Sequence, residues 1–205
     1  MRVAILISGS GSNMAALIAA TRDPDFPAEI VTVVSNRPNA PGLLLARDAG
    51  VRAVAIDHRP FAGDRAGHEA AIDAALRQAG TELVCLAGYM RLLTPFLVQA
   101  WQGRMLNIHP SLLPAFPGLD THSRAVAAGV KLHGCTVHLV TQTMDEGPIL
   151  AQAAVPVLPD DTAETLAGRV LVQEHILYPR ALRCFASGER GIAPSANFAL
   201  ANPAG

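Results

Sequence analysis

The chain has almost no net charge and no block of like charges. It contains 16 Lys and Arg against 17 Asp and Glu in 205 residues, which gives a formal net charge of −1 with neutral histidines. Proteins that bind nucleic acid or an anionic membrane surface present a basic face or stripe. The composition therefore argues against nucleic acid and against membranes as partners.

Cysteine pairs and long apolar segments are also missing. The three cysteines, Cys85, Cys135 and Cys184, form no Cys-x-x-Cys pair, which suits a reducing compartment and small buried side chains. No apolar run approaches the roughly 20 residues of a membrane-spanning helix. Met1-Arg2 leads straight into a predicted strand rather than into a signal peptide. We expect a soluble cytoplasmic protein.

No set of His, Cys or acidic residues has the spacing of a metal site. His133 and His138 lie five residues apart in a predicted strand from His133 to Val140. They would face opposite sides of that strand and could not hold one ion. We predict no metal, and we interpret both histidines as hydrogen-bonded structural residues.

The chain does contain a regular alternation of apolar strands and helices, and 50% of its residues are hydrophobic, enough for a large core. This pattern predicts a doubly wound α/β fold: a mostly parallel sheet with helices on both faces and an antiparallel strand near the C-terminal part. We expect one domain over residues 1–188. Residues 189–205, rich in Ala, Asn and Pro, are predicted to form a loosely ordered tail.

A glycine-rich segment, residues 9–13 (GSGSN), follows the first predicted strand. A predicted helix, Met14 to Thr21, begins directly after it, and Ser12 or Asn13 could cap that helix. Backbone N–H groups and the helix dipole make such a turn a good anion site. The same pattern also fits a tight turn before a capped helix without any ligand.

A dinucleotide site is an alternative interpretation of the same segment, and it fits less well. Met14 occupies the place of the third glycine, and no acidic residue follows the next predicted strand, Ile30 to Ser35. Arg37 lies there instead and could favour the 2′-phosphate of NADP.

An amide and an imidazole are predicted to lie side by side at a strand end. Met105 to His109 forms a short buried strand closed by Pro110, and Asn107 and His109 share a face because side chains alternate. The carboxyl ends of strands in open α/β sheets bind ligands. An amide can donate to a developing oxyanion, and an imidazolium can supply a proton, as acyl transfer requires. The alternative is a histidine satisfied by its neighbours.

A carboxylate in a later loop could complete this site. Asp145 lies in MDEGPIL (144–150), a loop that leads into a new strand. If it reaches His109, it stabilises the charged imidazolium. Ser111 lacks the G-x-S-x-G context of an activated nucleophile. We therefore predict direct transfer rather than an acyl-enzyme.

These segments, in this order, resemble the glycinamide ribonucleotide formyltransferases, folate-dependent members of the formyltransferase superfamily. The resemblance runs from about residue 3 to about residue 187. The segments that carry it are ISGSGSN (7–13), LAGYMRLL (86–93), GRMLNIHPSLLPAFPG (103–118), HGCTVHLV (133–140), MDEGPIL (144–150) and QEHILYP (173–179). Asp120 departs from the pattern, since many bacterial relatives carry His there, and the roles of Asp120 and His122 stay open.

The resemblance implies formyl transfer from the co-substrate 10-formyltetrahydrofolate to the amine of glycinamide ribonucleotide, by a monomer or homodimer without a metal. It implies that the catalytic residues are Asn107, His109 and Asp145. It implies that the ribonucleotide is bound by Gly11, Ser12, Asn13 and Glu174. It implies that the folate is bound by Arg65, Met90, Arg91, Leu92, Leu93 and Asn107. The alternatives are core packing for the apolar residues, solvent exposure for Arg65, and solvent exposure or an ion pair for Glu174.

Three rival functions share part of this pattern. A formyltetrahydrofolate hydrolase has the same Asn-His-Asp core but carries a regulatory domain ahead of it, whereas the first predicted strand here begins at Val3. Methionyl-tRNA formyltransferase carries a further C-terminal domain, and this chain shows no basic character. A non-catalytic folate- or nucleotide-binding regulator could keep the fold, although it would not need Asn107, His109 and Asp145.

Overall fold

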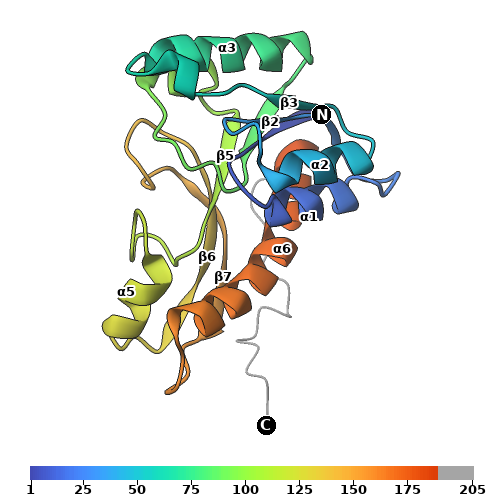
Figure 1. The fold of residues 1–205 in the computed structure, drawn as a ribbon. Coiled ribbons are helices and arrows are strands. Elements are labelled where there is room, and N and C mark those ends of the chain that lie inside the picture. Colours follow the sequence, from blue (N-terminus) through green and yellow to red (C-terminus); the bar gives the residue numbers. More distant parts are fainter. Residues whose placement is uncertain (189–205) are drawn as a thin grey trace.

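A seven-stranded sheet with helices on both faces forms the molecule (Figure 1). The structure is a computed structural model, and it describes residues 1–188. The strands are β1 (Arg2–Ile7), β2 (Glu29–Ser35), β3 (Ala53–Ala55), β4 (Leu83–Leu86), β5 (Met105–His109), β6 (Leu132–Leu139) and β7 (Ile149–Pro156). The helices are α1 (Ser12–Ala20), α2 (Pro41–Asp48), α3 (Arg65–Gln78), α4 (Pro95–Ala100), α5 (Thr121–Ala127) and α6 (Ala163–Ser187), with a 3₁₀ turn over Arg59–Phe61.

The strand order is β3-β2-β1-β4-β5-β6-β7. Strands β1 to β5 pair in parallel, whereas β6 is antiparallel to both of its neighbours. The predicted fold class is therefore confirmed. The chain moves outward from β1 to β3 and returns to β4 on the other side of β1, so the carboxyl ends of β1 and β4 flank the point where the order reverses. Ligands bind at this point in open α/β sheets.

Two apolar cores cover the two faces of the sheet. Val3, Ile5 and Ile7 of β1 belong to the core under α1 and α6, whereas Ala4 and Leu6 belong to the core under α3 and α4. All five residues are fully buried. A strand covered on both faces has no polar alternation, which explains the continuous apolar run in the sequence.

The start of α1 differs from the prediction. The helix begins at Ser12, and its N-cap is Gly11 in the left-handed conformation (φ 77°), with no side-chain cap. The prediction that Ser12 or Asn13 caps α1 is wrong, because the chain turns one residue earlier through a conformation that favours glycine. A Cβ on Gly11 would lie 3.0 Å from Cα of Gly42, so α1 and α2 also approach closely there.

Strand β3 is short, and α6 buries a charged residue. Strand β3 covers only Ala53–Ala55. On α6, Ile176 is 43% exposed, whereas Glu174 is buried. The alternative of solvent exposure is therefore wrong for Glu174.

Within residues 1–188, no helix is long and apolar enough to cross a membrane, and no group of three or more His, Cys, Asp or Glu is arranged to hold a metal ion. The predicted tail, residues 189–205, lies outside the described residues.

Candidate active site

Asn107 and His109 end β5 on the same face, where β6 pairs with them in antiparallel register. Asn107 lies opposite His138, and His109 lies opposite Thr136. The loop between β6 and β7 brings Asp145 to them: Oδ2 of Asp145 lies 3.5 Å from Nδ1 of His109. Both side chains are less than a tenth exposed. The structure therefore brings together the three residues that the sequence singled out.

Both ring nitrogens of His109 face acceptors. Nδ1 faces the Asp145 carboxylate, and Nε2 lies 3.0 Å from the backbone carbonyl oxygen of Phe116. Phe116 has a positive φ of 53°, so the loop after β5 presents this carbonyl in an unusual backbone conformation. A doubly protonated ring can donate to both acceptors.

The backbone around Asp145 holds its carboxylate in place. The Gly118 N–H donates to Oδ2 at 2.8 Å, and Asp145 itself has a positive φ of 59°. A Cβ on Gly147 would lie 1.7 Å from the carbonyl oxygen of Leu139. This position therefore requires glycine, which explains the Gly in the Asp-Glu-Gly-Pro turn.

His138 is a site residue whose role the sequence did not reveal. Its Nδ1 lies 2.9 Å from the carbonyl oxygen of Leu139, so the ring proton is on Nδ1 and Nε2 is free to accept. The Asn107 amide donates to that Nε2 at 3.2 Å. Burial lowers the pKa of His138 and keeps the ring neutral. His138 therefore fixes the orientation of the Asn107 amide through one amide N–H, and the second N–H of Asn107 stays available to donate to a substrate.

Ser111 has a structural role in the loop after β5. It is fully buried, and its hydroxyl donates to the carbonyl oxygen of Ala115 at 2.6 Å. The Thr136 hydroxyl donates to the Ser111 carbonyl at 2.7 Å and accepts from the Leu113 N–H at 3.0 Å. This network fixes the loop, and within residues 1–188 the Ser111 hydroxyl has no histidine or carboxylate partner that could activate it.

The turn between β1 and α1 lines a cavity of about 190 Å³. It is lined by residues 8–13, Arg37, Ala87, Gly88 and Met90. The Asn13 amide donates to Oε2 of Glu174 at 2.7 Å, which links α1 to α6 beside this turn. Burial raises the pKa of Glu174. The predicted ribonucleotide residues thus come together, and Arg37 joins them as the cation of the cavity wall.

The loop after β4, residues 88–94, borders the same cavity through Gly88 and Met90. Met90 and Leu92 are 63% and 61% exposed, so the alternative of core packing is wrong for them. Leu93 packs partly against the core under α3 and α4. Arg65 opens α3 and is exposed; among the described residues it makes no hydrogen bond or ion pair to another predicted site residue.

The comparisons with known proteins agree with this geometry. A family model described as formyl transferase matches residues 1–182. The chain belongs to the formyl transferase family.

Several known proteins are similar to this chain over most of its length. The trifunctional purine biosynthetic protein adenosine-3 of Bos taurus is 49% identical over 187 residues, which are 91% of this chain but only 18% of that protein. Phosphoribosylglycinamide formyltransferase of Haemophilus influenzae is 40% identical over 91% of this chain and 88% of its own length. The crystal structure of phosphoribosylglycinamide formyltransferase from Brucella melitensis is 58% identical, with a TM-score of 0.87, over 95% of this chain and 98% of that one. The resemblance predicted from the sequence is confirmed.

In this member of the formyl transferase family, Asp120 is exposed and adopts a left-handed conformation (φ 55°) at the start of α5, where its side chain makes no capping hydrogen bond. His122 packs edge-on against His133 at 5.2 Å between ring centroids, and His133 packs against Phe116 at 5.8 Å. Neither ring nitrogen of His133 makes a hydrogen bond with good geometry among the described residues. The ring of His133 fills a space lined by other rings, whereas the expectation of a hydrogen-bonded His138 is confirmed.

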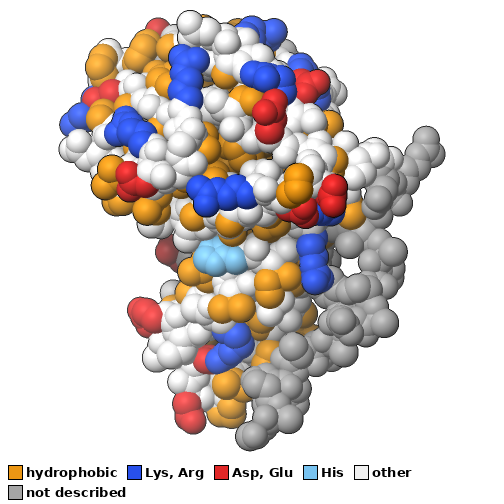
Figure 2. Space-filling view, turned by 90° about the vertical axis from the view of Figure 1, so that its right-hand side faces the viewer, with side chains coloured by type: hydrophobic (Ala, Val, Ile, Leu, Met, Phe, Trp, Pro, Cys, Tyr) orange, Lys and Arg blue, Asp and Glu red, His pale blue; other side chains and the backbone are white. Residues whose placement is uncertain are grey.

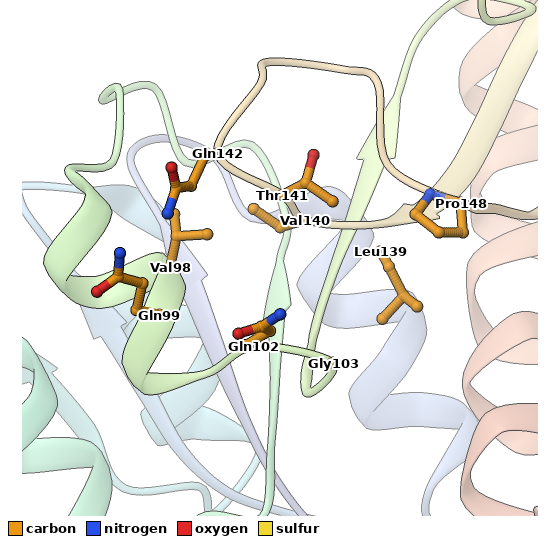
Figure 3. A pocket seen from close by; sticks show the side chains of 9 residues that line it. All are labelled: Val98, Gln99, Gln102, Gly103, Leu139, Val140, Thr141, Gln142 and Pro148. Atoms are coloured by element: carbon orange, nitrogen blue, oxygen red, sulfur yellow. The ribbon is translucent and has the colours of Figure 1, made fainter.

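Two surface features lie outside this set of residues. Figure 2 shows one face on which basic, acidic and apolar side chains are interspersed, without a patch of one charge. Figure 3 shows a second pocket of about 350 Å³ between the end of α4 and the chain that leaves β6. It is lined by Val98, Gln99, Gln102, Gly103, Leu139, Val140, Thr141, Gln142 and Pro148, none of which is a predicted site residue.

Proposed function

We propose that the chain transfers the formyl group of 10-formyltetrahydrofolate to the amine of glycinamide ribonucleotide, giving formylglycinamide ribonucleotide in purine biosynthesis. The observation that carries the proposal is the group formed by Asn107, His109 and Asp145 at the end of β5. The β1–α1 turn and the loop after β4 follow the carboxyl ends of β1 and β4, and β4 lies between β1 and β5 in the sheet. The carboxyl ends of β1, β4 and β5 thus carry an anion site, an apolar loop and an acid with an oxyanion donor. We expect the reaction to take place in the cytoplasm.

The ribonucleotide phosphate would bind at the β1–α1 turn. The N–H groups of the first turn of α1 and the helix dipole favour an anion there, and Arg37 adds a positive charge at the wall of the cavity. Asn13 and Glu174, joined by their hydrogen bond, offer acceptors for the ribose hydroxyls. The amine would then extend past the end of β4 toward β5.

The folate would bind along residues 88–94. Met90 and Leu92 expose apolar side chains that can cover a flat ring, and Arg65 and Arg91 can pair with carboxylates. With both substrates held at the carboxyl end of the sheet, the attack of the amine on the formyl carbon becomes effectively unimolecular.

In the reaction, the amine nitrogen attacks the formyl carbon, and the carbonyl oxygen gains a negative charge. The free N–H of Asn107 and a proton on His109 would stabilise this oxyanion. The bond from the formyl carbon to N10 then breaks, the amine loses a proton, and N10 gains one. The Nε2–H of His109 already donates to the Phe116 carbonyl. To donate to the oxyanion as well, this N–H must either divide its hydrogen bond between the two oxygens or leave the Phe116 carbonyl.

Steady-state turnover of an Asn107 variant tests the proposal. Asn107→Ala removes the oxyanion donor and should lower kcat by about 10²–10³ with small changes in KM. Gln142→Ala is the matched control, since it removes an exposed amide from the loop after β6 and should leave turnover unchanged. Equal turnover of the parent and Asn107→Ala would contradict the assignment.

A further inference from the structure

Glu69 is a buried carboxylate on α3. The residue is 3% exposed, and among residues 1–188 no Lys, Arg or His forms an ion pair with it. Its two oxygens accept two hydrogen bonds from one residue: the Thr94 N–H at 2.7 Å and the Thr94 hydroxyl at 2.5 Å. A carboxylate is costly to bury, so a fold that keeps one there without a cation depends on these hydrogen bonds.

Thr94 is the last residue of the loop after β4. It occupies the N-cap position of α4, yet its side chain makes no capping hydrogen bond to that helix, because its hydroxyl donates to Glu69. The hydrogen bonds of Glu69 therefore fix the end of the loop to α3.

The start of the same loop is held by Ser8. The Met90 N–H donates to the Ser8 hydroxyl at 2.9 Å, and the Ser8 N–H donates to the Gly88 carbonyl at 3.1 Å. Ser8 is buried and donates in turn to Oδ1 of Asn36. In the described part of the chain, the backbone of residues 91–93 makes no hydrogen bond, so the middle of the loop depends on its two ends.

Burial of side chains cannot replace these two attachments. Met90 and Leu92 are 63% and 61% exposed; Tyr89, near the start of the loop, and Leu93 pack partly against the core under α3 and α4, which leaves the stretch between them without a buried side chain of its own. We infer that Glu69 is a positioning residue that holds residues 91–94 in the conformation that binds folate, an inference that rests on the proposed function. Glu69 itself contacts the loop through Thr94 and does not touch the reacting atoms.

Two substitutions at Glu69 separate its contributions. Glu69→Ala removes both acceptors and should raise the folate KM about tenfold, while the glycinamide ribonucleotide KM changes less than about twofold. Glu69→Gln keeps one acceptor for the Thr94 N–H, and its amide can donate to the Thr94 hydroxyl. It should restore most of the folate affinity.

Asp73→Ala is the matched control. Asp73 lies one turn further along α3, accepts from the Trp101 indole N–H at 2.9 Å and pairs with Arg77. It therefore also ties α3 to α4, but at the far end of α4 from the loop. Asp73→Ala should lower the thermal midpoint as Glu69→Ala does and leave the folate KM within about twofold of the parent.

Calorimetric binding of 10-formyltetrahydrofolate completes the test, because it needs no turnover. A folate Kd raised about tenfold in Glu69→Ala alone supports the inference. Equal losses for both substrates, or the same loss in Asp73→Ala, would overturn it. If the parent binds folate but transfers no formyl group, the proposed function fails while the folate Kd still decides the role of Glu69. A parent that binds no folate overturns both.

Discussion

Replacing Asp145 by Asn removes the charge from the centre of the site and keeps the shape of the side chain. The carboxylate lies 3.5 Å from His109 Nδ1 and 3.8 Å from His138 Nε2. At this separation, an effective dielectric constant of about 20 gives a gross attraction of about 5 kcal/mol for a protonated His109. The cost of burying the carboxylate offsets part of it. A net loss of about 2.7 kcal/mol, equal to about 100-fold in kcat, is the expected scale.

The pH dependence of kcat tests whether the loss of activity in Asp145→Asn comes from the lost charge. Without the carboxylate, the charged ring of His109 loses the anion that faces its Nδ1, and lower pH should restore part of the activity. The KM values should change little, since the interaction matters mainly in the transition state. Glu146→Gln is the control, because it removes an exposed carboxylate one residue further on and should leave the profile unchanged. A pH series of kcat for the parent and for Asp145→Asn checks this, and equal pH profiles of the two proteins would refute the reasoning.

Three further predictions concern the anion site and the buried rings. Gly11→Ala should weaken glycinamide ribonucleotide binding and lower the free energy of unfolding by about 1–2 kcal/mol, because φ of residue 11 is 77° and the new Cβ would lie 3.0 Å from Cα of Gly42. Denaturant unfolding and calorimetric binding check this prediction. A variant with unchanged stability and affinity would refute it. Arg37→Met should raise the glycinamide ribonucleotide KM and reduce its dependence on salt, with the folate KM unchanged; an unchanged salt dependence would count against a role for Arg37. Burial lowers the pKa of His133 to about 4, whereas the pKa of an unperturbed histidine is about 6.5. Between these two pH values the unfolded chain binds more protons than the folded one. His133 therefore lowers the free energy of unfolding as the pH falls through this window, by about 3 kcal/mol at most. In His133→Gln the loss of stability toward low pH should be smaller than in the parent, as measured by denaturant midpoints across that window, and equal slopes would exclude His133 as a source.

The periodic elements of the fold could be predicted because local pattern determines them. The period-two pattern placed Asn107 and His109 on one face of β5, and β5 covers the predicted residues, Met105 to His109. Asp145 could complete the site only if its loop reached His109, and the 3.5 Å distance meets this condition. These features depend on alternation, caps and turn residues close in sequence.

Contacts between distant segments could not be predicted from the pattern. His138 lies opposite Asn107 only because of the register between β5 and β6, and register depends on the loops that join the strands. The bond between Asn13 and Glu174 joins residues 161 positions apart, so only the family resemblance indicated a shared site. Glu69 resembles any other helical glutamate in the sequence, and its burial follows from the packing of α3 against α4.

The transfer of an isotopic label tests the central claim most directly. The parent is mixed with glycinamide ribonucleotide and 10-formyltetrahydrofolate carrying ¹³C in its formyl group, and the label is followed by NMR. The account predicts that the label appears in the formamide of formylglycinamide ribonucleotide, with no release when the ribonucleotide is omitted. Label released as formate at the same rate with and without the ribonucleotide would contradict the account and identify a hydrolase.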